Sequence, residues 1–450
     1  MSLVPAPRLL WWAAAAGLPP ALLLVGAPAL WPVVAAVWGA LAFAALADAV
    51  AAPGRARSLG IVFPGTVRLT HEREGEIELR VQRAAGRPVG VRVAPAMPSE
   101  LEAAEPILEA ALPAEATSRV LALRATPRRR GVFRIARCVV ECASPLGFWS
   151  VRRVHSVACE VRSYPNLFGE RRRVPGLFLY RGHAGAHRQR QIGKGREFEK
   201  LREYLPGDSY EDVHWKATAK RGRPVTKLFQ VERTQEVYAV VDSSRLSARA
   251  SIESGADGVP SASEPALERM VRAALVLALA AERQGDLFGL VTFGDRVRGF
   301  VRARSGPSHF QTCREALYAL GSQTASPDFD ELASFLRLRL RRRALLVFLT
   351  DLDDPVLAES FLRAADLLRR QHLLMVCTLR PADVAPLFSR PAANVEEVYR
   401  ELAGHLRWHD QRELGRALER RGVGYSALEA ESLCADVVSK YAEIKQRQAL

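Results

Sequence analysis

The chain has 450 residues, of which 48% are hydrophobic, so it is too long for one small domain and apolar enough to bury more than one core. Its formal net charge of +15 suits a nucleic-acid-binding protein, and it equally suits the cytoplasmic side of a membrane protein. The presence or absence of a membrane-spanning segment decides between these two classes.

The first segment, residues 1–54, is dominated by an apolar run. No charged residue occurs from Leu9 to Ala47, which is about twice the ~20 residues that one spanning helix needs. Pro19, Pro20 and the Gly-Ala-Pro stretch at 26–28 interrupt this run near its middle and favour a reversal there. The sequence therefore predicts a transmembrane hairpin of two helices. A cleaved signal peptide is the alternative, disfavoured because a second apolar span follows at once.

Basic residues flank the apolar run on both sides. Arg8 precedes it, and Arg55 and Arg57 follow it. Because positively charged flanking residues stay in the cytoplasm, both ends of the hairpin are expected on that side. We therefore expect the chain in the inner (plasma) membrane, in contact with the lipid bilayer through two spans, with the bulk of its residues cytoplasmic.

Residues 55–166 place apolar side chains at every second position, as in TVRLTHEREGEIELRVQ, between turn-forming residues. This alternation predicts a small β-sandwich. Its loops contain no clustered catalytic residues, so a packing or docking module is expected. The chain's six cysteines lie mostly in apolar runs without paired close spacing, which is typical of reduced core residues.

Residues 167–233 form a connector that contains the stretch GREFEKLREYLPGDSYEDVHWKATAKRGRPVTKLFQVER, beginning at Gly195. Here charged side chains surround a few aromatic and turn-forming residues. Two interpretations are open: a charged network around Trp215 that fastens the sandwich to the following domain, or a docking surface for a partner or polar ligand. We favour the fastening, because no nucleophile with a neighbouring base is visible.

Residues 234–450 alternate short apolar strands with amphipathic helices, which predicts a doubly wound α/β sheet. Such sheets bind ligands at the carboxyl ends of their strands, where Asp242 and Asp351 both fall. No Gly-rich phosphate loop accompanies either aspartate, which disfavours a nucleotide site. The polar residues 253–265 are expected to form a flexible insertion after the first strand.

Two resemblances to known families follow from these motifs. AVVDSSRLS, LFGLVTFGD and LLVFLTDLDD resemble the sheet-edge segments of a von Willebrand factor A domain. The connector stretch resembles the signature of the bacterial domain-of-unknown-function 58 family, and the upstream segments RRGVF and SPLGFW resemble further family segments. The signature residues, with a structural or docking role, are Arg202, Tyr204, Gly207, Asp208, Trp215 and Thr218.

The resemblance to the A-type domain implies a divalent-ion site made of an Asp-x-Ser-x-Ser loop, a distant Thr and a further Asp, suited to Mg²⁺. The residues that match are Asp242, Ser244 and Asp351. Leu246 stands where the second Ser belongs, and Ser247 is one place late. No clear Thr is present, and Asp328 and Asp330 are the nearest oxygens. The sequence therefore predicts a degraded metal-ion-dependent adhesion site.

Proteins that resemble this chain are thought to act with MoxR-type AAA+ ATPases in complex assembly or cell-envelope processes. We therefore expect a non-enzymatic, membrane-anchored interaction protein that binds such an ATPase at the strand ends bearing Asp242, Ser244 and Asp351. Two alternatives stay open: a metal-assisted hydrolase using Asp242 and Asp351, and a basic nucleic-acid binder. Neither a complete acid–base pair nor a basic face with stacking aromatic residues supports them, so no nucleic-acid partner is expected.

Overall fold

The computed structural model describes residues 1–26, 30–83, 89–113, 115–170, 174, 192–205, 210, 213–230, 235–254, 260–381, 383–387, 389 and 394–447. The chain divides into two units, Met1–Asn166 and Leu167–Leu450. This division lies where the sequence places the end of the β-sandwich.

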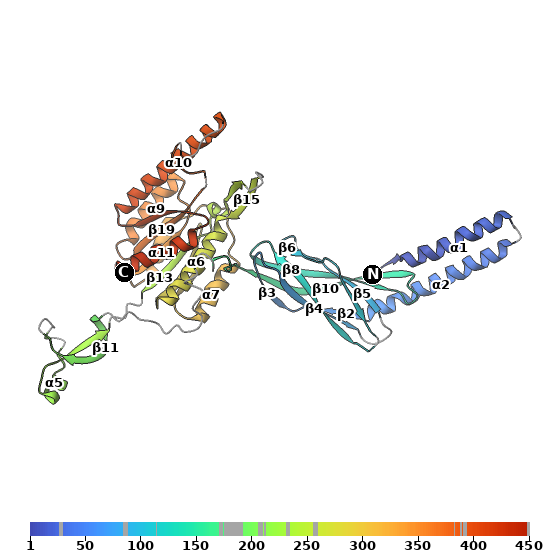
Figure 1. The fold of residues 1–450 in the computed structure, drawn as a ribbon, viewed down its shortest axis with the longest axis horizontal. Coiled ribbons are helices and arrows are strands. Elements are labelled where there is room, and N and C mark those ends of the chain that lie inside the picture. Colours follow the sequence, from blue (N-terminus) through green and yellow to red (C-terminus); the bar gives the residue numbers. More distant parts are fainter. Residues whose placement is uncertain are drawn as a thin grey trace. The chain divides into compact units, whose positions relative to one another are not determined.

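Two helices open the first unit, α1 (Pro7–Gly26) and α2 (Trp31–Arg57), and they run side by side (Figure 1). Helix α1 continues through Pro19 and Pro20 and ends at Gly26, where the predicted Gly-Ala-Pro stretch begins. Within the described residues, α2 is the one helix long and apolar enough to cross a membrane, which corrects the expectation of two. Helix α1 contains two internal prolines, which lack a backbone N–H, whereas α2 has one.

The remainder of the first unit is made of two sheets that enclose one core. Their strand orders are β1-β10-β9-β5-β7, with β3 beside β10, and β2-β4-β8-β6. The strands are β1 (Ser2–Pro5), β2 (Leu59–Val62), β3 (Thr66–Thr70), β4 (Gly75–Arg83), β5 (Val89–Pro95), β6 (Leu101–Ala103), β7 (Leu108–Leu112), β8 (Ser118–Pro127), β9 (Gly131–Ala143) and β10 (Trp149–Tyr164). Alternate residues of β4 and β5 are buried, and both sheets contribute to the shared core, as the alternating sequence predicts.

Both ends of the helical hairpin are joined to this sandwich. Before α1, strand β1 pairs antiparallel with β10, with Ser2 opposite Arg152. After α2, the chain enters β2 directly. Near the end of α2, the buried carboxylate of Asp48 accepts hydrogen bonds from the Ser144 hydroxyl (2.5 Å) and from the backbone N–H groups of Leu146 (2.8 Å) and Phe148 (3.1 Å). The SPLGFW segment, residues 144–149, therefore holds the end of α2 against the sandwich.

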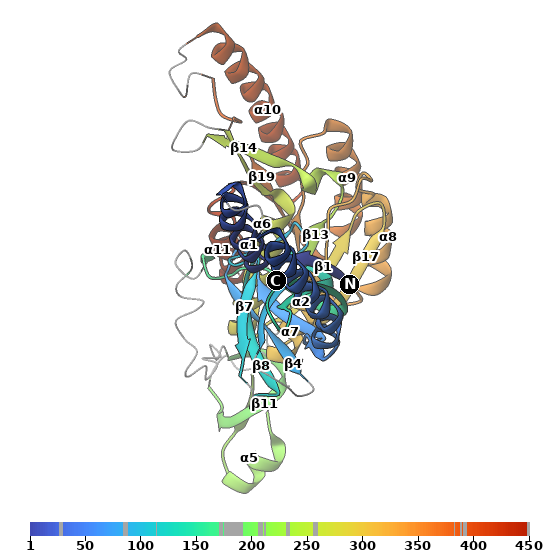
Figure 2. The same cartoon turned by 90° about the vertical axis from the view of Figure 1, so that its right-hand side faces the viewer.

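The second unit contains a six-stranded sheet of order β17-β16-β13-β18-β19-β20 (Figures 1 and 2). Edge strand β17 is antiparallel to its neighbour, and the other strands are parallel. The strands are β13 (Glu236–Asp242), β16 (Leu287–Phe293), β17 (Val297–Arg304), β18 (Ala344–Leu349), β19 (Leu373–Arg380) and β20 (Gly424–Glu429). The predicted doubly wound α/β sheet is thus present.

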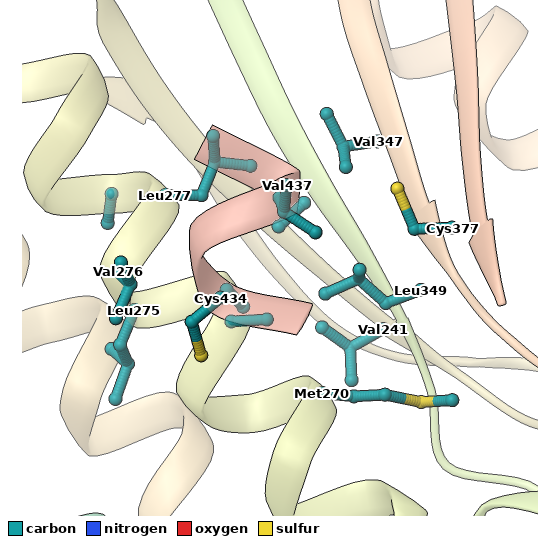
Figure 3. Close-up of a cluster of buried hydrophobic side chains, with 14 of the residues drawn as sticks. Val241, Met270, Leu275, Val276, Leu277, Val347, Leu349, Cys377, Cys434 and Val437 are labelled. Carbon is teal, nitrogen blue, oxygen red and sulfur yellow. The ribbon is translucent and has the colours of Figure 1, made fainter. Parts of the chain in front are cut away.

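Helices cover both faces of this sheet, because alternate strand residues point to opposite sides. Val237, Ala239 and Val241 of β13 enter one core, with α6 (Ala266–Arg283), α7 (Pro307–Tyr318) and α11 (Leu433–Gln446). Tyr238 and Val240 enter the other, with α8 (Phe329–Arg339), α9 (Pro355–Leu368) and the end of α10 (Val395–Glu419). Figure 3 shows the first core, in which Cys377 and Cys434 lie among aliphatic side chains, as expected of reduced core cysteines.

Two smaller elements complete the second unit. Strands β11 (Ile192–Glu203) and β12 (Val225–Gln230) pair antiparallel, and the short helix α5 (Trp215–Arg221) lies between them in the chain. We call residues 192–230 the arm. Strands β14 (Ala250–Ser254) and β15 (Pro260–Pro265) form a hairpin where the sequence predicted a flexible insertion. Backbone pairing, which polar side chains do not prevent, explains the difference.

Candidate functional site

The carboxyl end of β13 positions the first candidate residue, Asp242. Its side chain is fully buried, and both carboxylate oxygens accept hydrogen bonds: one from the backbone N–H of Ser244 (2.8 Å), the other from the hydroxyl of Thr350 (2.6 Å). Burial raises the pKa of Asp242, and these hydrogen bonds act in the opposite direction. The carboxylate thus ties the loop after β13 to the end of β18.

Asp351 follows Thr350 and lies at the same edge of the sheet. One of its oxygens accepts a hydrogen bond from the backbone N–H of Asp353 (2.9 Å), and the other contacts the guanidinium of Arg249 at 3.0 Å. Burial, and then the negative charge of Asp353, raise the pKa of Asp351 to about 6, although Arg249 opposes this. Arg249 is therefore the cationic residue that directly contacts the carboxylate of Asp351.

The polar edge continues from Asp353 onto helix α10. The guanidinium of Arg407 donates to Asp353 at 2.6 Å and to Asp383 at 3.2 Å, and the amide of Gln411 donates to Asp353 at 2.6 Å. A cavity of about 790 Å³ between α9 and α10 adjoins these residues, with Leu352 and Leu414 among its apolar lining. We call the carboxyl ends of the strands, with these side chains of α10, the rim of the sheet. The polar side chains of the rim are hydrogen-bonded to one another, and they lie beside a cavity that is lined partly by apolar residues.

The residues predicted to hold Mg²⁺ lack one oxygen of the A-type pattern. Leu246 is buried at the position of the second serine, and the hydroxyl of Ser247 donates to the carbonyl of Ser244 at 2.7 Å. Asp328 caps helix α8 by accepting from the N–H groups of Asp330 and Glu331, and so does not join the site.

The signature residues of the arm form the second candidate site. Trp215 begins α5 and is 71% exposed, which contradicts the expectation of a network packed around it. Tyr204 stacks on Tyr210 with ring centroids 5.7 Å apart, and the hydroxyl of Thr218 accepts from the N–H of Val225 at 3.1 Å. Gly207, Asp208 and the side chain of Arg202 lie outside the described residues.

Both candidate sites fall within one family match. Residues 200–385 match the family described as "Protein of unknown function DUF58". The chain contains a DUF58 region. The match begins in β11 of the arm and ends after β19, so this DUF58 region includes Trp215 as well as Asp242, Arg249 and Asp351.

Proteins and solved structures similar to parts of this chain are also found. Uncharacterized proteins of Mycobacterium tuberculosis and Mycobacterium bovis are 27% identical over 194 residues, which is 43% of this chain and 57% of the relatives' own length. An aerotolerance-related membrane protein from Bacteroides fragilis matches 47% of this chain and 99% of its own, with 14% identity and a TM-score of 0.31. BatB from Bacteroides thetaiotaomicron matches 46% of this chain and 99% of its own, with 13% identity and a TM-score of 0.29.

Sequence reasoning missed three residues of the rim. Thr350 directly precedes Asp351 in the DUF58 region, so its position beside a strand end could have indicated it. Arg249 and Arg407 gave no such signal, because their contacts with Asp351 and Asp353 join segments 102 and 54 positions apart. Only the folded sheet brings these cations to the aspartates.

Proposed function

We propose that this chain is a non-enzymatic, membrane-anchored docking protein whose arm binds a MoxR-type AAA+ ATPase. The observation that carries the proposal is the exposure of large side chains on the arm. Tyr210 is 76% exposed, Trp215 is 71% exposed and Leu205 is 52% exposed. Because Trp and Tyr dominate the binding energy of many protein interfaces, their exposure favours a docking surface over an internal fastening.

The charge of the part of the arm around α5 indicates the chemistry of the partner at that end. From Val213 to Val231 the sequence contains no acidic residue, and Lys216, Lys220 and Arg221 of α5 are exposed. An acidic surface with an apolar pocket for an aromatic side chain is complementary to this element. The choice of a MoxR-type ATPase comes from the family resemblance, and the arm supplies the contact.

The anchor is proposed from the two N-terminal helices. Apolar side chains along them lie in solvent in the absence of lipid, for example Trp11 (77% exposed), Phe43 (74%) and Val50 (76%). Helix α2 is long and apolar enough to span a bilayer, and both β1 and β2 belong to the sandwich. The basic residues Arg55 and Arg57 in the last turn of α2 favour the cytoplasmic side for that end of the helix and for the sandwich that follows it.

The rim geometry supports docking at the arm rather than hydrolysis at Asp242 and Asp351. Asp242 is enclosed, and each of its carboxylate oxygens already accepts a hydrogen bond. A general base must reach the proton that it removes, either directly or through one water. The same enclosure disfavours Asp242 as a direct contact for a partner, so the binding surface expected at the rim is reassigned to the arm.

The test is a Trp215→Ala substitution in the full chain, reconstituted in lipid nanodiscs, with binding to a purified MoxR-type ATPase as the readout. Removing an interface anchor typically costs about 2 kcal/mol, so the Kd is expected to rise roughly 30-fold. The melting temperature should not change, because surface substitutions usually act within about 0.5 kcal/mol.

The matched control is Tyr399→Ala, since Tyr399 is a similarly exposed aromatic residue (69%) on α10, outside the arm. This variant should bind the ATPase like the parent. Unchanged affinity of the Trp215 variant would refute docking at the arm, and a lowered melting temperature with unchanged binding would restore the fastening interpretation.

A further inference from the structure

The oxygens at the carboxyl ends of β13 and β18 are already occupied by groups of the protein. Asp242 accepts from the N–H of Ser244 and from the hydroxyl of Thr350. Asp351 accepts from the N–H of Asp353, which leaves its second oxygen for a cation. That cation is the guanidinium of Arg249, whose Nη1 lies 3.0 Å from Oδ2 of Asp351.

The position of Arg249 follows from the loop after β13. Ser244 caps the short helix Arg245–Ala248, accepting from the N–H of Leu246, and Arg249 is the residue at which this helix ends. Leu246 is 1% exposed, so an aliphatic side chain fills the space where the A-type pattern requires a second serine oxygen. The loop thus loses one oxygen ligand and gains a positive charge that reaches Asp351.

The positive charge of Arg249 beside Asp351 distinguishes this loop from a metal site that merely lacks one ligand. A divalent ion at Asp351 would lie beside a guanidinium of the same sign, and like charges repel strongly where burial weakens solvent screening. The side chain of Asp351 is 17% exposed, whereas that of Arg249 is 51% exposed. The carboxylate is therefore shielded on one side by the protein and on the other by a tethered cation.

We propose that the guanidinium of Arg249 takes the place of the divalent cation, so that this domain neutralises Asp351 without Mg²⁺ or Mn²⁺. Removing the guanidinium then opens a divalent-cation site at Asp351. The proposal does not depend on the identity of the partner or on the role of the arm.

The test measures Mn²⁺ binding to the full chain in detergent micelles, by calorimetry and by electron paramagnetic resonance, in the absence of any partner. The parent is expected to show only weak, non-saturable binding. Arg249→Gln removes the charge and keeps a polar side chain, and it should bind one Mn²⁺ at least ~10-fold more tightly than the parent. Adding Asp351→Asn to this variant should abolish the gain.

Arg245→Gln is the matched control, because Arg245 lies in the same loop and bonds to Ser326 rather than to Asp351. It should bind Mn²⁺ as weakly as the parent. Circular dichroism and melting of each variant show whether the fold is kept, and Arg249→Lys, which keeps a positive charge, should also exclude the ion. Saturable Mn²⁺ binding by the parent would overturn the proposal, and so would a folded Arg249→Gln variant that binds no ion.

Discussion

The thiols illustrate how burial alone sets the chemistry of a side chain. All six cysteines are free and buried, and burial raises the pKa of Cys138 and of Cys377 to about 12. A thiol with such a pKa stays protonated near neutral pH and is a poor nucleophile and a poor metal ligand. These cysteines therefore contribute packing, as their apolar sequence context predicts.

His372, at the turn before β19, shows the opposite consequence of burial. It is 2% exposed, and within the described structure neither ring nitrogen has a hydrogen-bond partner. Burial lowers its pKa from the ordinary value of 6.5, because the charged imidazolium is desolvated. The unfolded chain therefore binds the proton more readily than the folded chain does.

The linkage between protonation and folding predicts a pH dependence for the parent. Stability is full above about pH 6.5 and falls as the pH drops toward the lower folded-state pKa. His372→Leu should reduce the loss of unfolding free energy between pH 7.5 and pH 5.5, measured by urea denaturation. His409→Leu is the control, since His409 is 55% exposed beside Glu413, and it should leave the profile unchanged. Equal profiles for the parent and the His372 variant would contradict this assignment.

At the scale of elements, the junction between α2 and the sandwich depends on one carboxylate. Asp48 accepts two backbone N–H groups of the SPLGFW segment, and the indole N–H of Trp149 in the same segment donates to the carbonyl of Ala45 at 2.8 Å. These contacts fix the helix end to the loop between β9 and β10. The SPLGFW segment, which resembles a family motif, therefore has a structural role: it holds α2 against the sandwich.

Asp48→Ala should destabilise this junction, because it leaves the N–H groups of Leu146 and Phe148 without an acceptor. An unsatisfied buried donor costs roughly 1–3 kcal/mol, and these two donors are partly buried, so a loss of about 1–2 kcal/mol in unfolding free energy is expected in urea denaturation of the full chain in micelles. Glu102→Ala is the control, since Glu102 forms an exposed pair with Arg128 and should cost less than about 1 kcal/mol. A similar loss in both variants would show that Asp48 has no special role.

The sequence allowed the elements with strong local periodicity to be predicted. The alternation in β4 and β5 and the strand–helix succession after Glu236 depend on side chains that each face a core, so the pattern is local. Strand β1 could not be predicted, since its four residues gain their partner in β10 about 150 positions later. At the rim, strand ends indicated Asp242 and Asp351, but the cation that neutralises Asp351 became visible only in the fold.

At the scale of the whole molecule, the membrane span proposed for α2 predicts which positions face opposite sides of the membrane. Leu30, between α1 and α2, is 43% exposed, and Ile107 in the sandwich is 54% exposed. Leu30→Cys should react with a membrane-impermeant maleimide in intact cells, whereas Ile107→Cys should react only after permeabilisation. The native cysteines are buried and should contribute little signal. Equal labelling of the two variants before permeabilisation would exclude the topology proposed here.

The pairing of β1 with β10 also sets an order of events during synthesis. Ser2 emerges from the ribosome 150 residues before Arg152, its partner in the sheet, which is a wait of about 8–30 s at ~5–20 residues per second. Helices α1 and α2 emerge within that interval, while β1 is still without its partner strand. The sheet therefore gains its edge strand β1 only after both helices between β1 and β10 have been made.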